Sequence, residues 1–401
     1  MSRLSALAAA PLLAGILVAC GLLAPAEGLA LPRMALTAGS PCSTCHVLPQ
    51  GGGARNTIGW GSEHWAGAIP WQKLGLASLE ESEDPGFFDN RLLVGGDLRT
   101  QIARLGRPVI DPKGDADSVV FSGNVPGTPP DYMAIPMQMQ PYVTALPMDW
   151  LMLTGSFNVS ALKTHYPGQG TWDAAVIVKG KGWVPGVRAG MIQPSIGVRH
   201  DDHTMLLRSD AISPRQPIIP PNYAELGAEL HWQPKSWLQV NAGGFANSQL
   251  RKTVTSVAAG PAWLARVAVL PQFLDWRVNT WLGASAFGSD EFMLLNAFAG
   301  VGKDKVAALM VEGSASRRAG EHETLNLMAK LALPLKPWLV LEGRVEQAAT
   351  KTKTRDLQTR QLVLGAQLLP IAYLELRPEY RLIKTDEYAL GQYTLQVHAF
   401  F

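Results

Sequence analysis

The chain ends in Tyr393-Thr394-Leu395-Gln396-Val397-His398-Ala399-Phe400-Phe401, a stretch in which apolar and polar side chains alternate. Successive side chains of a β-strand point to opposite faces of the sheet. One face would carry Tyr393, Leu395, Val397, Ala399 and Phe401, and the other would carry Thr394, Gln396 and His398. The stretch therefore predicts a final strand with lipid on one side and a polar lumen on the other.

The same alternation runs through residues 91–401, with turn residues between the candidate strands; Leu151–Val159 and Trp338–Val345 are examples. Trp and Tyr favour the boundary between membrane and water, and an aromatic girdle marks the periplasmic rim of a membrane barrel. Four segments have a tight turn, then Trp or Tyr, then Leu, and we expect them at that rim: Pro147–Leu151, Pro234–Leu238, Pro334–Leu339 and Pro370–Leu374.

Longer polar connections, Gly106–Asp131 and Arg199–Asn222, lie on the other side of the candidate strands. Short turns on one side and long loops on the other are typical of outer-membrane barrels. Counting from Arg91 gives about sixteen strands, an even number as in that class. The predicted fold is all-β, a transmembrane antiparallel β-barrel of the bacterial outer membrane. A secreted, β-rich soluble protein is the alternative.

The composition agrees with a membrane barrel and excludes one class of partner. Lys and Arg number 35 against 33 Asp and Glu, so the formal net charge is +2. A nucleic-acid-binding protein needs a basic face to meet phosphates, and we therefore expect no nucleic-acid partner. Charged residues make up 17% of the chain, below the usual quarter of a soluble domain. Outer-membrane lipid is the surrounding that we expect.

Residues 1–30 have the pattern of an export signal. Arg3 precedes an apolar run, and Gly28-Leu29-Ala30 offers a cleavage site. No later segment has the ~20 apolar residues that a membrane-spanning helix needs. Leu17-Val18-Ala19-Cys20-Gly21 also has the form of a lipoprotein processing site. Cys20 is therefore either removed with the signal or lipidated at the mature N-terminus.

Residues 31–90 contain Cys42-Ser43-Thr44-Cys45-His46, the C-x-x-C-H attachment motif of c-type haem. At this spacing two thiols add to the vinyl groups of the macrocycle, and the adjacent histidine becomes the proximal iron ligand. We predict one covalently bound haem c on Cys42, Cys45 and His46. A Cys42–Cys45 disulfide is the alternative. A zinc half-site is weaker, because no second cysteine pair exists.

The distal side of the iron has several candidate ligands. His203 lies in a long connection that could fold into the lumen, where Asp201 or Asp202 would orient its imidazole. His64 is the second candidate, and Met34 and Met205 follow. A solvated acidic loop is the alternative interpretation of the stretch around His203.

Gly51-Gly52-Gly53 and Arg55 follow the haem motif closely. Glycine has no side chain to clash, so the backbone can approach a macrocycle. The guanidinium of Arg55 has the fork geometry that pairs with a haem propionate. The alternative is that these are ordinary loop residues.

With these motifs in place, the chain resembles a known family. Pro32–Gly39, Cys42–His46 and Gly51–Asn56, with Pro49 between them, are similar to the start of fused monohaem c-type cytochrome–porin proteins of the bacterial outer membrane. Pro194–Arg199, followed by Asp202-His203-Thr204, resembles a segment of such barrels. Met34 departs from the family pattern. The relatives include iron-oxidising outer-membrane cytochromes, so the resemblance implies an extracellular Fe(II) donor.

These observations predict a signal peptide at 1–30, a haem-binding segment at 31–90 that plugs the lumen, and a barrel at 91–401. The predicted function is electron transfer between an extracellular donor or acceptor, such as iron, and a periplasmic cytochrome or other electron carrier. A haem-plugged porin for solute passage is the first alternative, and a haem peroxidase is the second. The sequence shows no recognisable nucleophile arrangement for a separate enzyme activity.

Overall fold

A computed structural model describes the chain from Ala35 to Phe400 with gaps. The signal peptide and Cys20 lie outside the described residues, as does most of the connection 106–131. The described residues are 35–36, 39–56, 58–59, 67–75, 86–105, 109–110, 132–159, 171–200, 202, 204–209, 211, 218–220, 222–253, 260–273, 278–318, 322–386 and 388–400.

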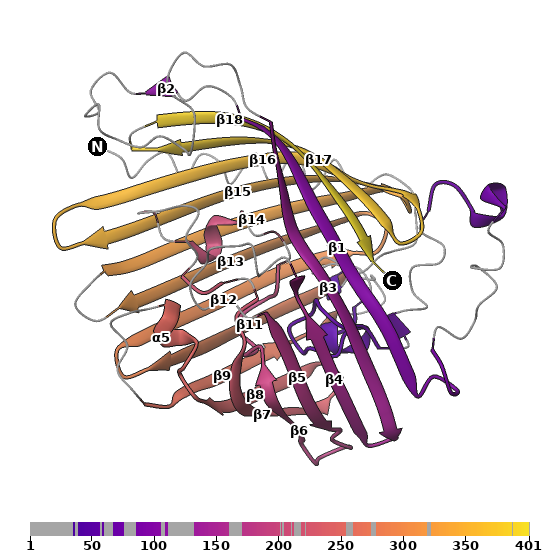
Figure 1. The fold of residues 1–401 in the computed structure, drawn as a ribbon. Coiled ribbons are helices and arrows are strands. Elements are labelled where there is room, and N and C mark those ends of the chain that lie inside the picture. The colour runs from indigo at the N-terminus through magenta and orange to yellow at the C-terminus, as the bar shows by residue number, and fades with distance from the viewer. Residues whose placement is uncertain are drawn as a thin grey trace.

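These residues form one antiparallel sheet of eighteen strands (Figure 1). Two of them, β2 (Val109–Ile110) and β10 (Gln272–Phe273), have only two residues, which leaves sixteen long strands. The long strands are β1 (Leu92–Leu105), β3 (Tyr132–Met148), β4 (Leu151–Phe157), β5 (Trp172–Val178), β6 (Gly186–Ile192), β7 (Glu225–Lys235), β8 (Leu238–Phe245), β9 (Ala262–Val269), β11 (Val278–Ser289), β12 (Phe292–Lys303), β13 (Ala307–Arg318), β14 (His322–Lys336), β15 (Leu339–Thr352), β16 (Asp356–Ile371), β17 (Leu374–Thr385) and β18 (Tyr388–Phe400). Short helices are η2 (Cys42–Thr44), η3 (Trp71–Leu74), η5 (Leu206–Arg208) and α5 (Leu250–Thr253).

The sheet closes into a barrel because β1 pairs with β3 on one side and with the last strand, β18, on the other. At this closing seam Asp97 lies opposite Phe400, and Arg104 lies opposite Tyr393. Each long strand of the described chain is antiparallel to its neighbours. The prediction of an all-β, antiparallel barrel of about sixteen strands is therefore confirmed.

The barrel wall is polar inside and apolar outside. In β18, Thr394, Gln396 and His398 are buried, whereas Tyr393 and Leu395 are exposed on the outer face. The predicted division of the last strand into two faces is therefore confirmed for residues 393–400; position 401 lies outside the described residues. The same pattern recurs around the barrel, where exposed apolar side chains of the wall include Val143, Leu153, Val176, Leu230, Val267, Leu282, Leu295, Val311, Leu325, Leu341 and Leu364.

The four aromatic residues expected at one rim lie in four short turns. Trp150 follows β3, Trp237 follows β7, Trp338 follows β14 and Tyr373 follows β16. Because neighbouring strands are antiparallel, these turns share one end of the barrel. The three tryptophans are exposed, as an aromatic girdle at a membrane boundary requires.

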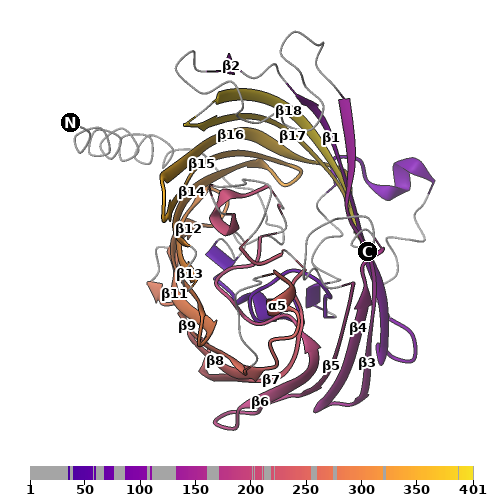
Figure 2. The ribbon, with the colours of Figure 1, turned by 60° about the vertical axis from the view of Figure 1, so that its left-hand side comes forward.

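Two segments occupy the space inside the ring of strands (Figure 2). The first consists of the described residues of the N-terminal segment 35–56, and the second of the described residues of the connection 193–224 between β6 and β7. Residues 67–70 lie elsewhere, at the rim beside the turn from β16 to β17, where the amides of Ala68 and Ile69 donate to Leu369 and Pro370 over 2.9 Å each. Within the described residues, no helix has the length and apolar character to cross a membrane.

Candidate functional site

The C-x-x-C-H motif forms one tight turn built on η2. The amide of His46 donates to the carbonyl oxygen of Cys42 over 2.9 Å, and the amide of Cys45 donates to the same oxygen over 3.2 Å. No disulfide joins these two cysteines, which are the ones that the structure describes. Two thiols and an imidazole therefore leave a single turn of backbone, and this donor set fits a haem c.

The chain folds back on this turn. His46 and Arg55 form an antiparallel bridge, and Gly51 lies in the loop between them with φ +89°. A Cβ at Gly51 would lie 3.3 Å from the Cys42 sulfur. A side chain at position 51 would crowd the thiol, so the glycine keeps the space beside the attachment point open.

Contacts from the barrel wall fix segment 35–56 in the interior. Gln239 of β8 donates its amide Nε2 to the Ser43 hydroxyl over 3.0 Å. Asn279 of β11 donates its amide Nδ2 to the carbonyl oxygen of Leu36 over 2.8 Å. Leu36 is fully buried, and a Cβ at Gly302 of β12 would lie 2.7 Å from its own Cβ. Leu36 can therefore pack this closely on β12 only because residue 302 has no side chain.

A buried polar hub joins this segment to the connection 193–224. The Ser195 hydroxyl lies 2.9 Å from the Gln50 side-chain oxygen and 2.7 Å from Glu229 of β7. Glu229 also pairs with Arg188 of β6 over 2.9 Å. The amide of Arg199 donates to the Gln50 carbonyl oxygen over 3.2 Å. Two interior segments and two strands therefore meet at one set of buried hydrogen bonds.

Cys42 packs against an apolar cluster that we call the motif cluster. Its members come from both interior segments and from five strands or their ends. Met205 and Trp281 belong to it, and the Trp281 and Phe298 rings meet edge to face with centroids 4.7 Å apart. The buried residues of the motif cluster are Ala35, Leu36, Val198, Met205, Leu207, Ala268, Leu270, Trp281, Phe298, Ala308, Met310 and Met328.

The motif cluster contains one donor that lacks a partner. The indole Nε1 of Trp281 has no hydrogen-bond acceptor among the described residues, although only 1% of the residue is exposed. Buried donors in native proteins are nearly always satisfied, so an acceptor from a bound group fits here. Burial also raises the pKa of the Cys42 thiol to about 11, and the nearby guanidinium of Arg266 offsets this only in part.

Arg55 lies against the closing seam of the barrel. Its guanidinium carbon is 4.4 Å from the centre of the Phe400 ring of β18. It also interacts electrostatically with Asp97 of β1, and its backbone amide donates a hydrogen bond to the Tyr142 hydroxyl of β3. Arg55 is 7% exposed. The arginine expected to meet a propionate thus also ties the motif to the two strands that close the barrel.

The candidates for the distal ligand are only partly described. His203, Asp201, His64 and Met34 lie outside the described residues. Met205 is buried in the motif cluster, against which Cys42 packs, and it is the candidate among them that the structure describes. Asp202, expected to orient His203, is engaged elsewhere.

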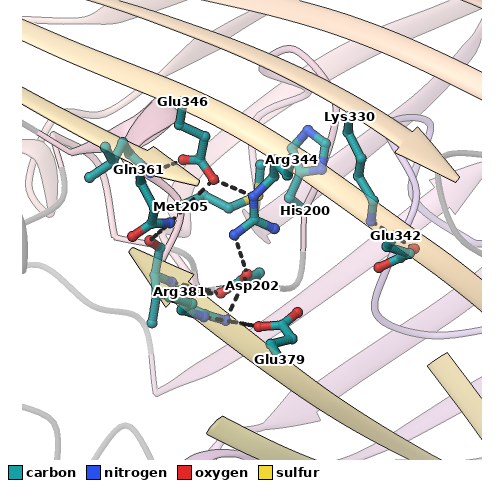
Figure 3. A network of polar contacts seen from close by, with 12 residues as sticks. His200, Asp202, Met205, Lys330, Glu342, Arg344, Glu346, Gln361, Glu379 and Arg381 are labelled. Atoms are coloured by element: carbon teal, nitrogen blue, oxygen red, sulfur yellow. Dashed lines mark hydrogen bonds and ion pairs between the residues drawn. The ribbon is translucent and has the colours of Figure 1, made fainter. Parts of the chain in front are cut away.

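Asp202 joins a buried network of charges on the barrel wall (Figure 3). Its Oδ2 lies 2.8 Å from Arg344 of β15 and 3.2 Å from Arg381 of β17. Arg344 also pairs with Glu346, and Arg381 pairs with Glu379. These ion pairs attach Asp202, and with it the connection 193–224, to β15 and β17 of the barrel wall.

Residues of the site that sequence reasoning missed lie on the inward faces of strands. Glu312 of β13 accepts from the Asn296 side chain over 2.7 Å and lies 2.6 Å from the His200 imidazole. The sequence signal was the alternation itself, since the charged residue at 312 falls on the polar face of its strand. Its partner on the connection 193–224 could not be read from the sequence.

Comparison with known proteins supports the fold. No protein-family model matches the sequence, and no curated protein matches it. The outer membrane channel DcaP of Acinetobacter baumannii has a similar structure, with a TM-score of 0.52 and 10% identity over 77% of this chain and 97% of that one. OprB of Pseudomonas putida has a TM-score of 0.51 and 10% identity over 85% of this chain and 99% of that one.

The chain is an outer-membrane β-barrel. At 10% identity the likeness shows the fold alone, and the apolar outer face supplies the second argument. Large exposed apolar surfaces need lipid or protein to cover them, and a barrel with this polarity is suited to a bilayer. The barrel therefore lies in the bacterial outer membrane, in contact with its lipid.

Proposed function

We propose that this barrel holds one haem c in its lumen and moves electrons across the outer membrane. The electrons would pass between an extracellular donor or acceptor, for example Fe(II), and a periplasmic cytochrome or other carrier. The observation that carries the proposal is the position of the Cys42–His46 turn, inside a ring of sixteen strands and against the motif cluster.

Each residue of the motif has a defined role in this proposal. The Cys42 and Cys45 thiols would each hold one vinyl group of the macrocycle as a thioether, and the His46 imidazole would hold the iron. When bound, the haem supplies one-electron redox chemistry. Met205 and His203 are the candidates for a second iron ligand, and a methionine there would raise the reduction potential.

The residues around the motif would control the access of water to the haem and the interactions of its propionates. The motif cluster excludes water from one side of the turn, and burial of this kind is one determinant of haem potential. The indole of Trp281 offers a hydrogen bond to a propionate. The apolar band of an outer-membrane barrel is about 25 Å tall. Because a single macrocycle is shorter, the donor and the acceptor must each approach one mouth of the barrel.

Passage of a small solute is a second candidate function. The fold neighbours include a channel, and this likeness supports the second candidate more directly than it supports electron transfer. The inner wall is also rich in charged and amide side chains, as in a hydrated pore. Against free passage, segment 35–56 and the connection 193–224 both occupy the lumen.

Absorption spectra of the detergent-extracted protein, produced with a haem-maturation system, test the proposal. We expect a sharp low-spin c-type spectrum that changes on reduction, with haem retained after denaturation. The Cys42→Ser, Cys45→Ser double variant should fold and lose the haem, while Ser43→Ala should keep it. A haem-free parent protein would rule the proposal out. A high-spin spectrum that shifts on adding cyanide would instead favour a peroxidase.

A second measurement separates electron transfer from solute passage. The barrel is reconstituted in liposomes that contain a reducible cytochrome, and Fe(II) is added outside. We expect reduction of the trapped cytochrome by the haem-loaded barrel and none by the double cysteine variant. Large, redox-independent conductance in planar bilayers, without such reduction, would favour the porin function.

A further inference from the structure

Two cations face the lipid from neighbouring strands. Arg360 of β16 and Lys384 of β17 are direct partners in the strand register, and both side chains are exposed. Neither has a hydrogen bond or an ion pair with any residue that the structure describes. Directly opposed side chains have Cβ atoms about 4.5–5.5 Å apart, and like charges in this arrangement are destabilising. The pair therefore offers a position for an anion.

The pair lies at one edge of the apolar outer face. Leu362 follows Arg360 by two residues and Leu382 precedes Lys384 by two, and both leucines are exposed on the same face. Arg360 lies four residues from the start of β16, at the end of the barrel opposite to the Trp338 turn. This edge is the extracellular boundary of the membrane, because the aromatic turns mark the periplasmic one.

Other outward cations at this edge have an acidic residue opposite them in the strand register. Arg317 of β13 lies 3.9 Å from Glu323 of β14. Lys351 of β15 lies opposite Asp356 in the register of β15 and β16. Asp386 lies two residues beyond Lys384, but its Oδ2 accepts a hydrogen bond from the amide of Gln358 over 2.7 Å, and it forms no ion pair with Arg360 or Lys384.

An apolar groove of about 960 Å³ begins at this pair. It crosses the outer face from β17 to β12, where small side chains leave space between larger ones. Neighbouring strands are about 4.8 Å apart, so the groove extends for roughly 24 Å across the six strands. This extent is comparable to the length of an extended acyl chain. Ala299, Val311, Leu327, Val345 and Leu362 contribute to its lining.

We propose that this face binds a phosphorylated lipid of the outer leaflet. The lipid phosphate lies between Arg360 and Lys384, and one acyl chain lies in the groove. An Arg guanidinium and a Lys ammonium are both strong phosphate binders, and basic clusters beside membrane segments recognise anionic headgroups. The phosphate neutralises the opposed charges, which neither cation can do for the other.

Native mass spectrometry of the full-length protein in detergent tests this inference. The probe is lipid A with two phosphate groups, titrated against the parent and the Arg360→Gln, Lys384→Gln double variant. Because the double variant loses two charge-assisted hydrogen bonds to the phosphate, we expect it to bind at least about tenfold more weakly. Lys351→Gln, at the same rim but with an acid opposite, should bind as the parent does.

Two further arms identify the source of the anion. Dephosphorylated lipid A should bind at least about tenfold more weakly than the diphosphorylated form. Inorganic phosphate alone should not compete at the concentrations that saturate with lipid A. Equal binding of both lipids would mean that only the acyl groove binds, and effective competition by free phosphate would mean that no lipid is specified; either result overturns the proposal.

A charge reversal separates lipid binding from folding. Arg360→Glu places a carboxylate opposite Lys384, so this variant should fold at least as well as the parent, because it replaces a repulsive pair by an attractive one. It should nevertheless lose the preference for the phosphorylated lipid. Unchanged binding by this folded variant would overturn the proposal.

Discussion

The carboxylate of Asp202 lies 2.8 Å from the guanidinium of Arg344, although 142 residues separate them in the chain. This contact fixes the connection 193–224 to β15 inside the barrel. The same carboxylate also meets Arg381 of β17. Removal of this carboxylate takes one acidic partner from each of two buried guanidinium groups and leaves Arg344 with Glu346 and Arg381 with Glu379, so the contact has a measurable effect on the lumen.

Asp202→Asn should loosen the connection 193–224 by about 1.5–3 kcal/mol, the usual contribution of a hydrogen bond to a charged group. We expect trypsin to cleave faster after Arg208, which lies in this connection. Asp149→Asn is the matched control, because the Arg91–Asp149 pair is exposed and exposed pairs contribute at most about 1 kcal/mol. Equal cleavage rates in both variants would contradict the role assigned to Asp202.

The contact should also survive mild acid. Burial alone would raise the pKa of Asp202, but Arg381, Arg344 and hydrogen bonds from Thr204 outweigh burial and lower this pKa well below its ordinary value. The stabilisation is complete above the unfolded-state pKa of about 3.9 and is lost only as pH falls through the lower folded-state value. Bilayer conductance of the parent should therefore stay constant from pH 7 to about pH 4. A rise within that range, absent from Asp202→Asn, would oppose this assignment.

Gly52→Ala should detach the haem motif from the connection 193–224. Gly52 has φ +71°, and a Cβ there would lie 2.5 Å from the Cδ of Arg199, which is itself buried. Gly75→Ala is the control, since Gly75 has φ +72° with nothing within 4 Å. Both variants carry the ~1–2 kcal/mol strain of a left-handed residue, but only the first displaces a neighbour.

Maleimide labelling of Cys42 in haem-free protein measures this difference. Labelling of the parent should be slow, because burial raises the pKa of the Cys42 thiol to about 11 and the thiolate is the reactive form. We expect faster labelling in Gly52→Ala and parental labelling in Gly75→Ala. Matching rates in the two variants would show that Arg199 does not hold the segment.

Leu36→Ala should weaken the docking of segment 35–56 on β12 by about 2–5 kcal/mol, as for other fully buried leucines. Leu36 is 0% exposed, whereas Leu74 is 46% exposed and serves as the control position. Hydrogen exchange read by mass spectrometry should accelerate across residues 39–56 in Leu36→Ala and stay unchanged in Leu74→Ala. Protected amides in both variants would mean that the polar contacts alone hold the segment.

The barrel could be predicted from sequence because its signals are local. The two faces of the strand ending at Phe400 follow from alternation within a few residues. The turns that carry Trp150, Trp237 and Trp338 are also readable from neighbouring residues. A period of two and a turn every ten or so residues require no knowledge of which strands meet. The strand count and the direction of each face follow from the same patterns.

The interior could not be predicted in the same way. The pairing of Asp202 with Arg344 and the approach of Glu312 to His200 depend on which strands face the connection 193–224 after the barrel closes. Nothing near position 202 in the sequence indicates two arginines from β15 and β17. The burial of Met205 in the motif cluster likewise depends on packing between segments far apart in the chain.

The stacking of Arg55 on Phe400 places the N-terminal segment beneath the strand that completes the ring. That arrangement constrains the order of haem attachment and barrel closure during assembly. Thiol addition to a macrocycle requires an accessible Cys42, and the finished barrel encloses this residue. A chain that carries haem must therefore receive it in the periplasm before β18 pairs with β1. The barrel wall would then close around a segment that already holds its haem. If haem arrived after closure, Cys42 would be enclosed and the barrel would stay without haem.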